Sequence, residues 1–168
     1  MDAMEAILTR RSIRQFTNQP VPEQLVKHLL EAAMCAPSAR NQQVWRFLVI
    51  RDKAKLAELQ QVHPNVPASG AALAVLVCGD LAAETAQGFW VQDCAAATQN
   101  LLLAAHASGL GAIWSGVYPR EERVANLKRL FGLPENIVPL SVLAIGYPAE
   151  SKGRQERYDS KKVHFDRW

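Results

Sequence analysis

The segment from about Thr85 to Ser108 is the feature that most constrains how this 168-residue chain can fold. It contains no proline, its one glycine (Gly88) lies near its start, and Gly109 follows it as a candidate helix C-cap. Its middle, CAAATQNLLLAAHA, is apolar on nearly every side, which is typical of a helix buried all round. As a helix the segment would span on the order of 35 Å, about the width of a small domain. We therefore expect a second subunit to cover one of its faces.

Shorter patterned segments surround this helix. Apolar spacing and helix-end signals predict helices over residues 3–10, 22–36, 53–61 and 119–131. Apolar runs predict strands in WRFLVIRD, AALAVLVCG, GAIWSG and IVPLSVLAIGYP. The second of these runs is continuous, which indicates a strand covered on both faces. Because helices and strands interleave without strict alternation, we predict an α+β fold with a mixed central sheet flanked by helices.

Length and composition favour one globular domain over residues 1–168. The hydrophobic share of 49% and the charged share of 21% are ordinary for such a domain. The net charge of +3 is mild and its basic residues are spread along the chain, which argues against nucleic acid as a partner. The tail, residues 149–168, is polar and basic and has no pattern that would let it fold alone.

Cysteine usage and the N-terminus bear on where the protein acts. Cys78 lies in an apolar run and Cys94 in an alanine-rich helix, so buried reduced thiols are expected, as in a reducing compartment. Asp2 and Glu5 precede any apolar stretch, which does not fit a signal peptide. No window approaches the roughly 20 apolar residues that a membrane span needs. We expect a cytoplasmic protein without a membrane partner.

Motifs for side-chain catalysis are absent. There is no GxxxxGK[ST], no GxGxxG that opens a helix and no GxSxG, and no histidine or cysteine spacing suits a metal. Asp80, Glu84 and Asp93 could form an acid–base set, although no pattern relates them, and His106 is expected to be a core histidine. An enzyme of this composition would rely on a cofactor that carries the chemistry itself.

The segment RRSIRQF, which begins at Arg10, places three arginines within five positions. In an extended chain Arg10, Ser12 and Arg14 would share one face, with Arg11 on the other. Two guanidinium groups flanking a hydroxyl suit a phosphate, because they donate charge-assisted hydrogen bonds. Solvated cations beyond a helix C-terminus are an equally good interpretation of this segment alone.

Three further features could contact a ligand. The loop PSARNQQVWRF, residues 37–47, carries amides that could bind a planar heterocycle or could simply connect two elements. Trp114-Ser115-Gly116 ends a strand, and the glycine would let a backbone N–H approach a ligand closely. Lys152 and Arg154 place two cations at alternate positions of the tail.

Four segments in this order resemble the nitroreductase family across essentially the whole chain: ILTRRSIRQF, APSARNQQVWRFLVI, VQDCAAATQNLLLAAHASGLGAIW and VLAIGYPAE. The chain is similar to a compact member. The resemblance implies an FMN-dependent NAD(P)H oxidoreductase, a homodimer with two FMN molecules at the subunit interface. It implies ping-pong hydride transfer to nitroaromatic, quinone or similar electron-poor acceptors, and it leaves NADH and NADPH open. A flavin-binding protein for storage or sensing, and an adaptor without a cofactor, are the alternatives.

The resemblance also assigns residues to the flavin phosphate and pyrimidine. The phosphate, the ribityl chain and the pyrimidine edge would be held by Arg10, Arg11, Ser12 and Arg14, and the phosphate site would be completed by Lys152 and Arg154. Arg14 would stabilise the negative charge that develops at N1–C2=O on reduction. The family's polar partner of the pyrimidine falls between His63 and Ser69, where Asn65 is the candidate.

The remaining assignments concern the ring of the flavin and the second subunit. Backbone N–H groups of Trp114, Ser115 and Gly116 would pass near N5, and a neighbouring subunit would lay against the ring a loop containing Pro37, Ser38, Ala39, Asn41 and Gln43. The chain has Gln43-Val44-Trp45 where the family usually has Gln-Pro-Trp, which frees one backbone dihedral. Phe89 and Trp90 either line the substrate pocket or pack in the core or interface. Residues 149–168 are expected to pack on the partner subunit.

Overall fold

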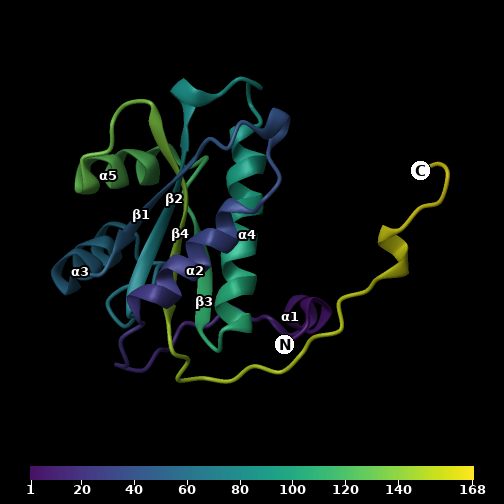
Figure 1. Cartoon of the computed structure of the whole chain (residues 1–168), viewed down its shortest axis with the longest axis horizontal. Helices are drawn as coiled ribbons and strands as arrows, with labels where there is room; N and C mark the ends of the chain where they lie inside the picture. Colours follow the sequence, from purple (N-terminus) through teal and green to yellow (C-terminus); the bar gives the residue numbers. More distant parts are fainter.

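The computed structural model describes residues 1–168 and is built around a four-stranded sheet (Figure 1). The strands are β1 (Trp45–Ile50), β2 (Leu73–Asp80), β3 (Gly111–Gly116) and β4 (Ile137–Gly146), in the order β1-β2-β4-β3. The predicted α+β class is confirmed. The sheet was predicted to be mixed, but all four strands are antiparallel to their neighbours. The connections β1–β2 and β3–β4 therefore each return to the end of the sheet from which they leave. The one parallel contact is an isolated bridge between Ser12 and Ala112.

Helices cover both faces of the sheet. They are α1 (Ala3–Thr9), α2 (Glu23–Met34), α3 (Lys53–Val62), α4 (Trp90–Ala107) and α5 (Glu121–Phe131). Figure 1 shows α2 and α4 on one side of the sheet and α3 and α5 on the other. Along β2, Val75 and Val77 belong to the core under α2 and α4, whereas Leu76 belongs to the core under α3 and α5. The prediction that this strand is covered on both faces is confirmed.

Helix α4 begins at Trp90, five residues later than the sequence pattern indicated. The backbone N–H groups of Thr85 and Ala86 donate to the Gln42 side chain, 2.9 Å from its Oε1, instead of entering a helical ladder. Gly88 has a φ of +84°, which a helix does not allow. The predicted end is confirmed, because the N–H of Leu110 bonds back to Ala105 at 2.8 Å beyond a left-handed Gly109.

One stripe of α4 stays accessible in the single chain. The buried residues of the helix face α2 and the sheet. Gln92 and Gln99 are exposed, and Ala96 and Leu103 are only partly buried. The all-round burial that the sequence predicts is therefore not reached within one chain.

The two core thiols are buried as predicted. Cys78 and Cys94 are almost inaccessible, and the Cys94 Sγ donates to the Cys78 carbonyl at 3.4 Å. Burial raises the pKa of each thiol to about 12, so both are unreactive. Cys35 is a free, exposed thiol. None of the helices has the length and apolar character needed to cross a membrane.

The C-terminal tail runs away from the body of the molecule (Figure 1). Apart from a short 3₁₀ turn at Ser160–Lys162 it has no regular structure. Its aromatic side chains are almost fully exposed, at 82% for Tyr158, 80% for Phe165 and 100% for Trp168. The packing of this tail on a second subunit stays a prediction.

Candidate functional site

The arginine-rich segment after α1 lies alongside the edge strand β3. The N–H of Ile13 donates to the Ala112 carbonyl at 3.1 Å, and Ile13 is buried. A Cβ on Gly111 would lie 2.6 Å from the Ile13 side chain, so glycine is required for this close approach. Because alternate residues of an extended chain point in opposite directions, the burial of Ile13 leaves Ser12 and Arg14 accessible.

Three arginines gather beside this segment without a carboxylate partner. Burial and the charges of Arg157 and Arg11 lower the pKa of the half-buried Arg10. Arg11 donates to the Gly153 carbonyl at 2.6 Å, and neither Arg10 nor Arg11 forms an ion pair. Like charges at close range repel unless an anion lies between them. An anion would relieve this repulsion, and Arg157 is a nearby cation that the sequence patterns did not single out.

The tail brings one of its two predicted cations to the same segment. The Lys152 ammonium donates to the Ser12 carbonyl at 2.7 Å and to Glu150 at 3.0 Å. Glu150 in turn accepts from the Arg14 N–H at 2.5 Å, and this bond and the bond from Lys152 lower the pKa of its carboxyl. Arg154 pairs with Glu156 at 3.2 Å in solvent and does not join the group.

Two cavities open beside this segment. A cavity of about 260 Å³ contains both Arg11 and Lys152 in its lining. A second, of about 530 Å³, is lined by Arg14 together with Trp114, Ser115 and Gly116. The predicted site residues are thus divided, with Arg11 beside Lys152 and Arg14 beside the end of β3.

The loop after α3 contributes to the lining of the larger cavity. Asn65 lines it, and the Asn65 carbonyl accepts from the Ser115 hydroxyl at 3.2 Å. The Gly116 carbonyl accepts from His63 Nε2 at 3.0 Å and from Arg123 Nη1 at 2.8 Å. His63 and Arg123 therefore hold the end of β3 in place through the Gly116 carbonyl. Sequence spacing could not reveal this role.

His63 makes the stability of this region dependent on pH. Its side chain is buried, its Nδ1 has no partner, and burial lowers its pKa below 6.5. As the pH falls, His63 is therefore protonated more readily in the unfolded chain than in the folded chain. The free energy of unfolding should decrease as the pH drops below 6.5. Urea titrations across that range should show a shallower fall for His63→Gln, which does not titrate. Equal slopes for His63→Gln and the wild type would contradict the assignment.

The loop Pro37–Asn41 lines a third cavity, separate from the two beside the arginine segment. About 410 Å³ in volume, this cavity is lined by Pro37, Ser38, Ala39, Phe89, Gln92, Asp93 and Ala96, none of which lines the two cavities beside the arginines. Phe89 faces this space, whereas Trp90 is buried and packs edge-on against Tyr118. One chain therefore does not bring the loop and the arginines around a single ligand.

The backbone of this loop is strained. Arg40, Asn41 and Gln43 have φ values of +52°, +53° and +46°, in the left-handed region that non-glycine residues rarely adopt. The Gln43 side chain donates to Asn41 at 2.8 Å, and the Gln43 N–H donates to the Ser38 hydroxyl at 3.1 Å. Val44, at the position of the family's proline, is fully buried, so the strand that follows keeps its place. Strain of this kind is concentrated at functional sites.

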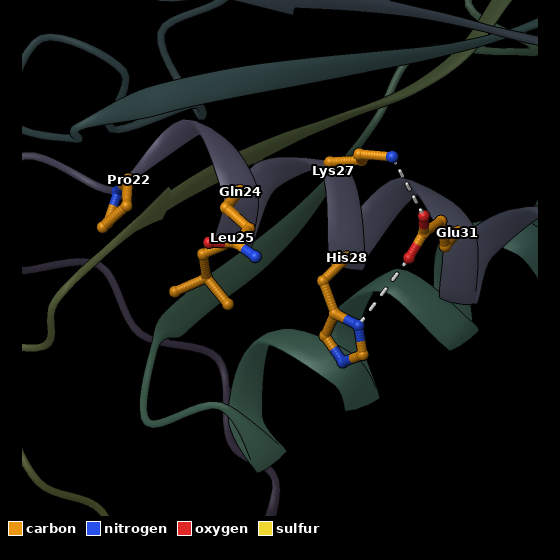
Figure 2. A pocket seen from close by; sticks show the side chains of 6 residues that line it. All are labelled: Pro22, Gln24, Leu25, Lys27, His28 and Glu31. Atoms are coloured by element: carbon orange, nitrogen blue, oxygen red, sulfur yellow. Dashed lines mark ion pairs between the residues drawn. The ribbon is translucent and has the colours of Figure 1, made fainter.

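The acidic residues Asp80 and Glu84 have structural roles, and one further concavity contains no predicted site residue. Asp80 pairs with Arg46 at 2.8 Å, and the Glu84 carboxylate accepts from the Trp90 N–H at 3.0 Å. No three histidine, cysteine, aspartate or glutamate side chains are placed to hold a metal ion. Figure 2 shows a concavity of about 520 Å³ along α2, whose Glu31 is paired with Lys27 and His28 at 3.8 and 3.9 Å. Exposed pairs of this kind contribute little, and no predicted site residue lies there.

Comparison with known proteins agrees with these observations. The model of the nitroreductase family matches residues 7–80 and 65–147. A protein of Methanothermobacter thermautotrophicus, provisionally named NADH dehydrogenase/NAD(P)H nitroreductase, is 48% identical over 100% of this chain and 88% of its own length. The chain therefore belongs to the nitroreductase family.

Two solved structures show the same fold with ligands bound. A provisionally named nitroreductase from Desulfovibrio desulfuricans, crystallised in complex with FMN, has a TM-score of 0.85 and 32% identity over 100% of this chain and 99% of that one. The NADPH:FMN oxidoreductase of Vibrio harveyi, complexed with NAD⁺, has a TM-score of 0.86 and 27% identity over 98% and 77% of the two chains.

Proposed function

We propose that this protein is an FMN-dependent NAD(P)H oxidoreductase that reduces electron-poor acceptors such as quinones and nitroaromatics by a ping-pong mechanism. The observation that carries the proposal is the group of arginines without a carboxylate partner, of which Arg11 lines the smaller cavity, because such cations suit the phosphate that the family's cofactor supplies. The two similar proteins with FMN and NAD⁺ in their structures support this choice. Buried free thiols fit the reducing cytoplasm, where we propose that the protein acts.

The residues present fit the proposed cofactor. Arg10, Arg11 and Lys152 would hold the phosphate, with the Ser12 hydroxyl as a neutral donor. When bound, FMN would supply the hydride chemistry between NAD(P)H and the acceptor through its N5. Arg14 would lie near the pyrimidine edge, where a cation stabilises developing negative charge, and Asn65 is the polar side chain in the same cavity that suits the pyrimidine. The end of β3, held by His63 and Arg123, would present backbone N–H groups to the ring.

A homodimer is required for a complete site. The loop Pro37–Asn41 would lie against the flavin held by a second copy, because within one chain it faces a separate cavity. An apolar groove of about 440 Å³ between α1, α2 and α4 would receive the second copy, and it is lined by Met1, Asp2, Ala3, Ala6, Ile7, Ala32, Cys35, Asn100, Leu103, Ala104 and Ala107. Exposed Met4, Leu8 and Met34 continue this apolar surface.

Anaerobic reduction tests the proposal and separates it from flavin storage. Protein loaded with FMN should lose its flavin absorbance when NADH or NADPH is added, and should regain it when benzoquinone follows in a separate step. Two separable half-reactions are the mark of a ping-pong cycle. A protein that binds FMN but is bleached by neither nucleotide would instead be a flavin-binding protein without turnover.

A further inference from the structure

Asp93, in the first turn of α4, is a buried carboxylate that the proposed reaction does not use. It is 4% exposed, and both its oxygens are occupied. Oδ1 accepts from the Ala39 N–H at 2.9 Å, and Oδ2 accepts from the Gln42 side-chain amide at 2.6 Å. A buried carboxylate is tolerated only when its hydrogen bonds are satisfied, so this arrangement ties α4 firmly to the strained loop.

Gln42 extends the connection to a third segment. Its Oε1 accepts from the N–H groups of Thr85 and Ala86, both at 2.9 Å. Its amide therefore donates toward Asp93 and accepts from the segment before α4, and only one orientation of the amide satisfies both sides. Residues of both joined segments line the 410 Å³ cavity, among them Ala39 and Phe89.

We propose that Asp93 is a positioning residue, which through Gln42 holds the loop Pro37–Asn41 and the segment Thr85–Phe89 as one unit against the flavin of the partner subunit. The role toward the flavin rests on the proposed function. The left-handed residues of the loop support it, because such a backbone persists only where its surroundings over-determine it. Both oxygens of Asp93 are taken by Ala39 and Gln42, so Asp93 acts by placing these neighbours.

Hydrogen-bond polarity offers a specific test. Asp93→Asn keeps the shape and the acceptor for Ala39, but its new amide faces the amide of Gln42, donor against donor. If the Gln42 amide turned over, its NH₂ group would instead face the N–H groups of Thr85 and Ala86, again donor against donor. We expect about ten-fold weaker FMN binding and about ten-fold faster hydrogen exchange at Ala39, Thr85 and Ala86, while the core amides of β2 stay protected.

A compensating substitution separates positioning from a general loss of structure. In the double variant Asp93→Asn with Gln42→Glu, the new carboxylate accepts from the new amide and from both backbone N–H groups, and the net charge equals that of the wild type. FMN affinity and exchange should return to within about two-fold of wild type. The matched control is Asp52→Asn, at the start of α3, where the carboxylate also accepts from a backbone N–H but contacts no part of the site.

Each outcome is decisive. Failure of the double variant to recover, or wild-type exchange at Thr85 and Ala86 in Asp93→Asn, would overturn the link. Faster exchange with unchanged FMN affinity would overturn the role toward the flavin. If the wild-type chain binds no FMN, the proposed function fails and the role toward the flavin fails with it, and the exchange data still decide whether Asp93 joins the two segments.

Discussion

Arg10→Ala combined with Arg14→Ala should lower the affinity for FMN by at least about 100-fold, because each arginine supplies a charge-assisted hydrogen bond worth about 1.5–3 kcal/mol. Arg10 belongs to the cluster without a carboxylate partner, and Arg14 lines the cavity at the end of β3. Flavin fluorescence titration measures the loss. Without flavin, the double variant should unfold at the same or a higher temperature, because repulsion around Arg10 is relieved.

The control for this prediction removes the same charge elsewhere. Arg129→Ala with Arg167→Ala takes two exposed cations from α5 and the tail, away from both cavities beside the arginine segment. It should leave FMN affinity within about two-fold of wild type. Equal losses in the two double variants would mean that net charge, and not a built phosphate site, attracts the cofactor.

Leu103→Arg should abolish both the dimer and flavin binding. Leu103 lies on the accessible stripe of α4 and lines the apolar groove between α1, α2 and α4. A dimer would bury the new guanidinium without a partner, which costs several kcal/mol. Sedimentation at micromolar concentration should show a dimer for the wild type and a folded monomer, without bound FMN, for the variant.

A matched substitution on another surface separates this effect from general damage. Leu81→Arg places the same charge at a leucine that is 39% exposed and lies outside the groove. That protein should remain a dimer with bound FMN. A monomeric wild-type protein, or an FMN-binding Leu103→Arg monomer, would contradict the shared site.

Much of the fold could be predicted because local patterns dominate it. The breaker residues and apolar periods predicted all five α-helices and all four strands, and Gly109 and Gly132 follow the ends of α4 and α5. The start of α4 was missed because a side chain far away in the sequence, Gln42, takes the N–H groups of Thr85 and Ala86. Strand direction was missed for a similar reason, since pairing depends on where each connection returns to the sheet.

The site was only partly predictable. Alternation separated the face of Ser12 and Arg14 from that of Arg11, and the family resemblance linked Lys152 to the arginine segment, whose Ser12 carbonyl accepts from Lys152. Arg11, on the other face, nevertheless shares a cavity with Lys152. From the sequence, Asp93 could be identified only as one of three acidic residues that no pattern relates. Its role depends on Gln42 and Ala39, contacts that cross 51 and 54 residues of sequence and follow only from packing. His63, Arg123 and Arg157 were hidden for the same reason.

Complementation between two defective chains tests the central claim, a flavin site built from two copies. One chain carries Arg10→Ala with Arg14→Ala, and the other carries Ala39→Trp, which fills the cavity beside the loop. Each alone should retain no FMN that NADH or NADPH can bleach. After the two are unfolded and refolded together, random pairing should restore about a quarter of the wild-type sites, because half of the dimers are mixed and each mixed dimer has one intact site. Mixed dimers that retain no reducible FMN would contradict the account.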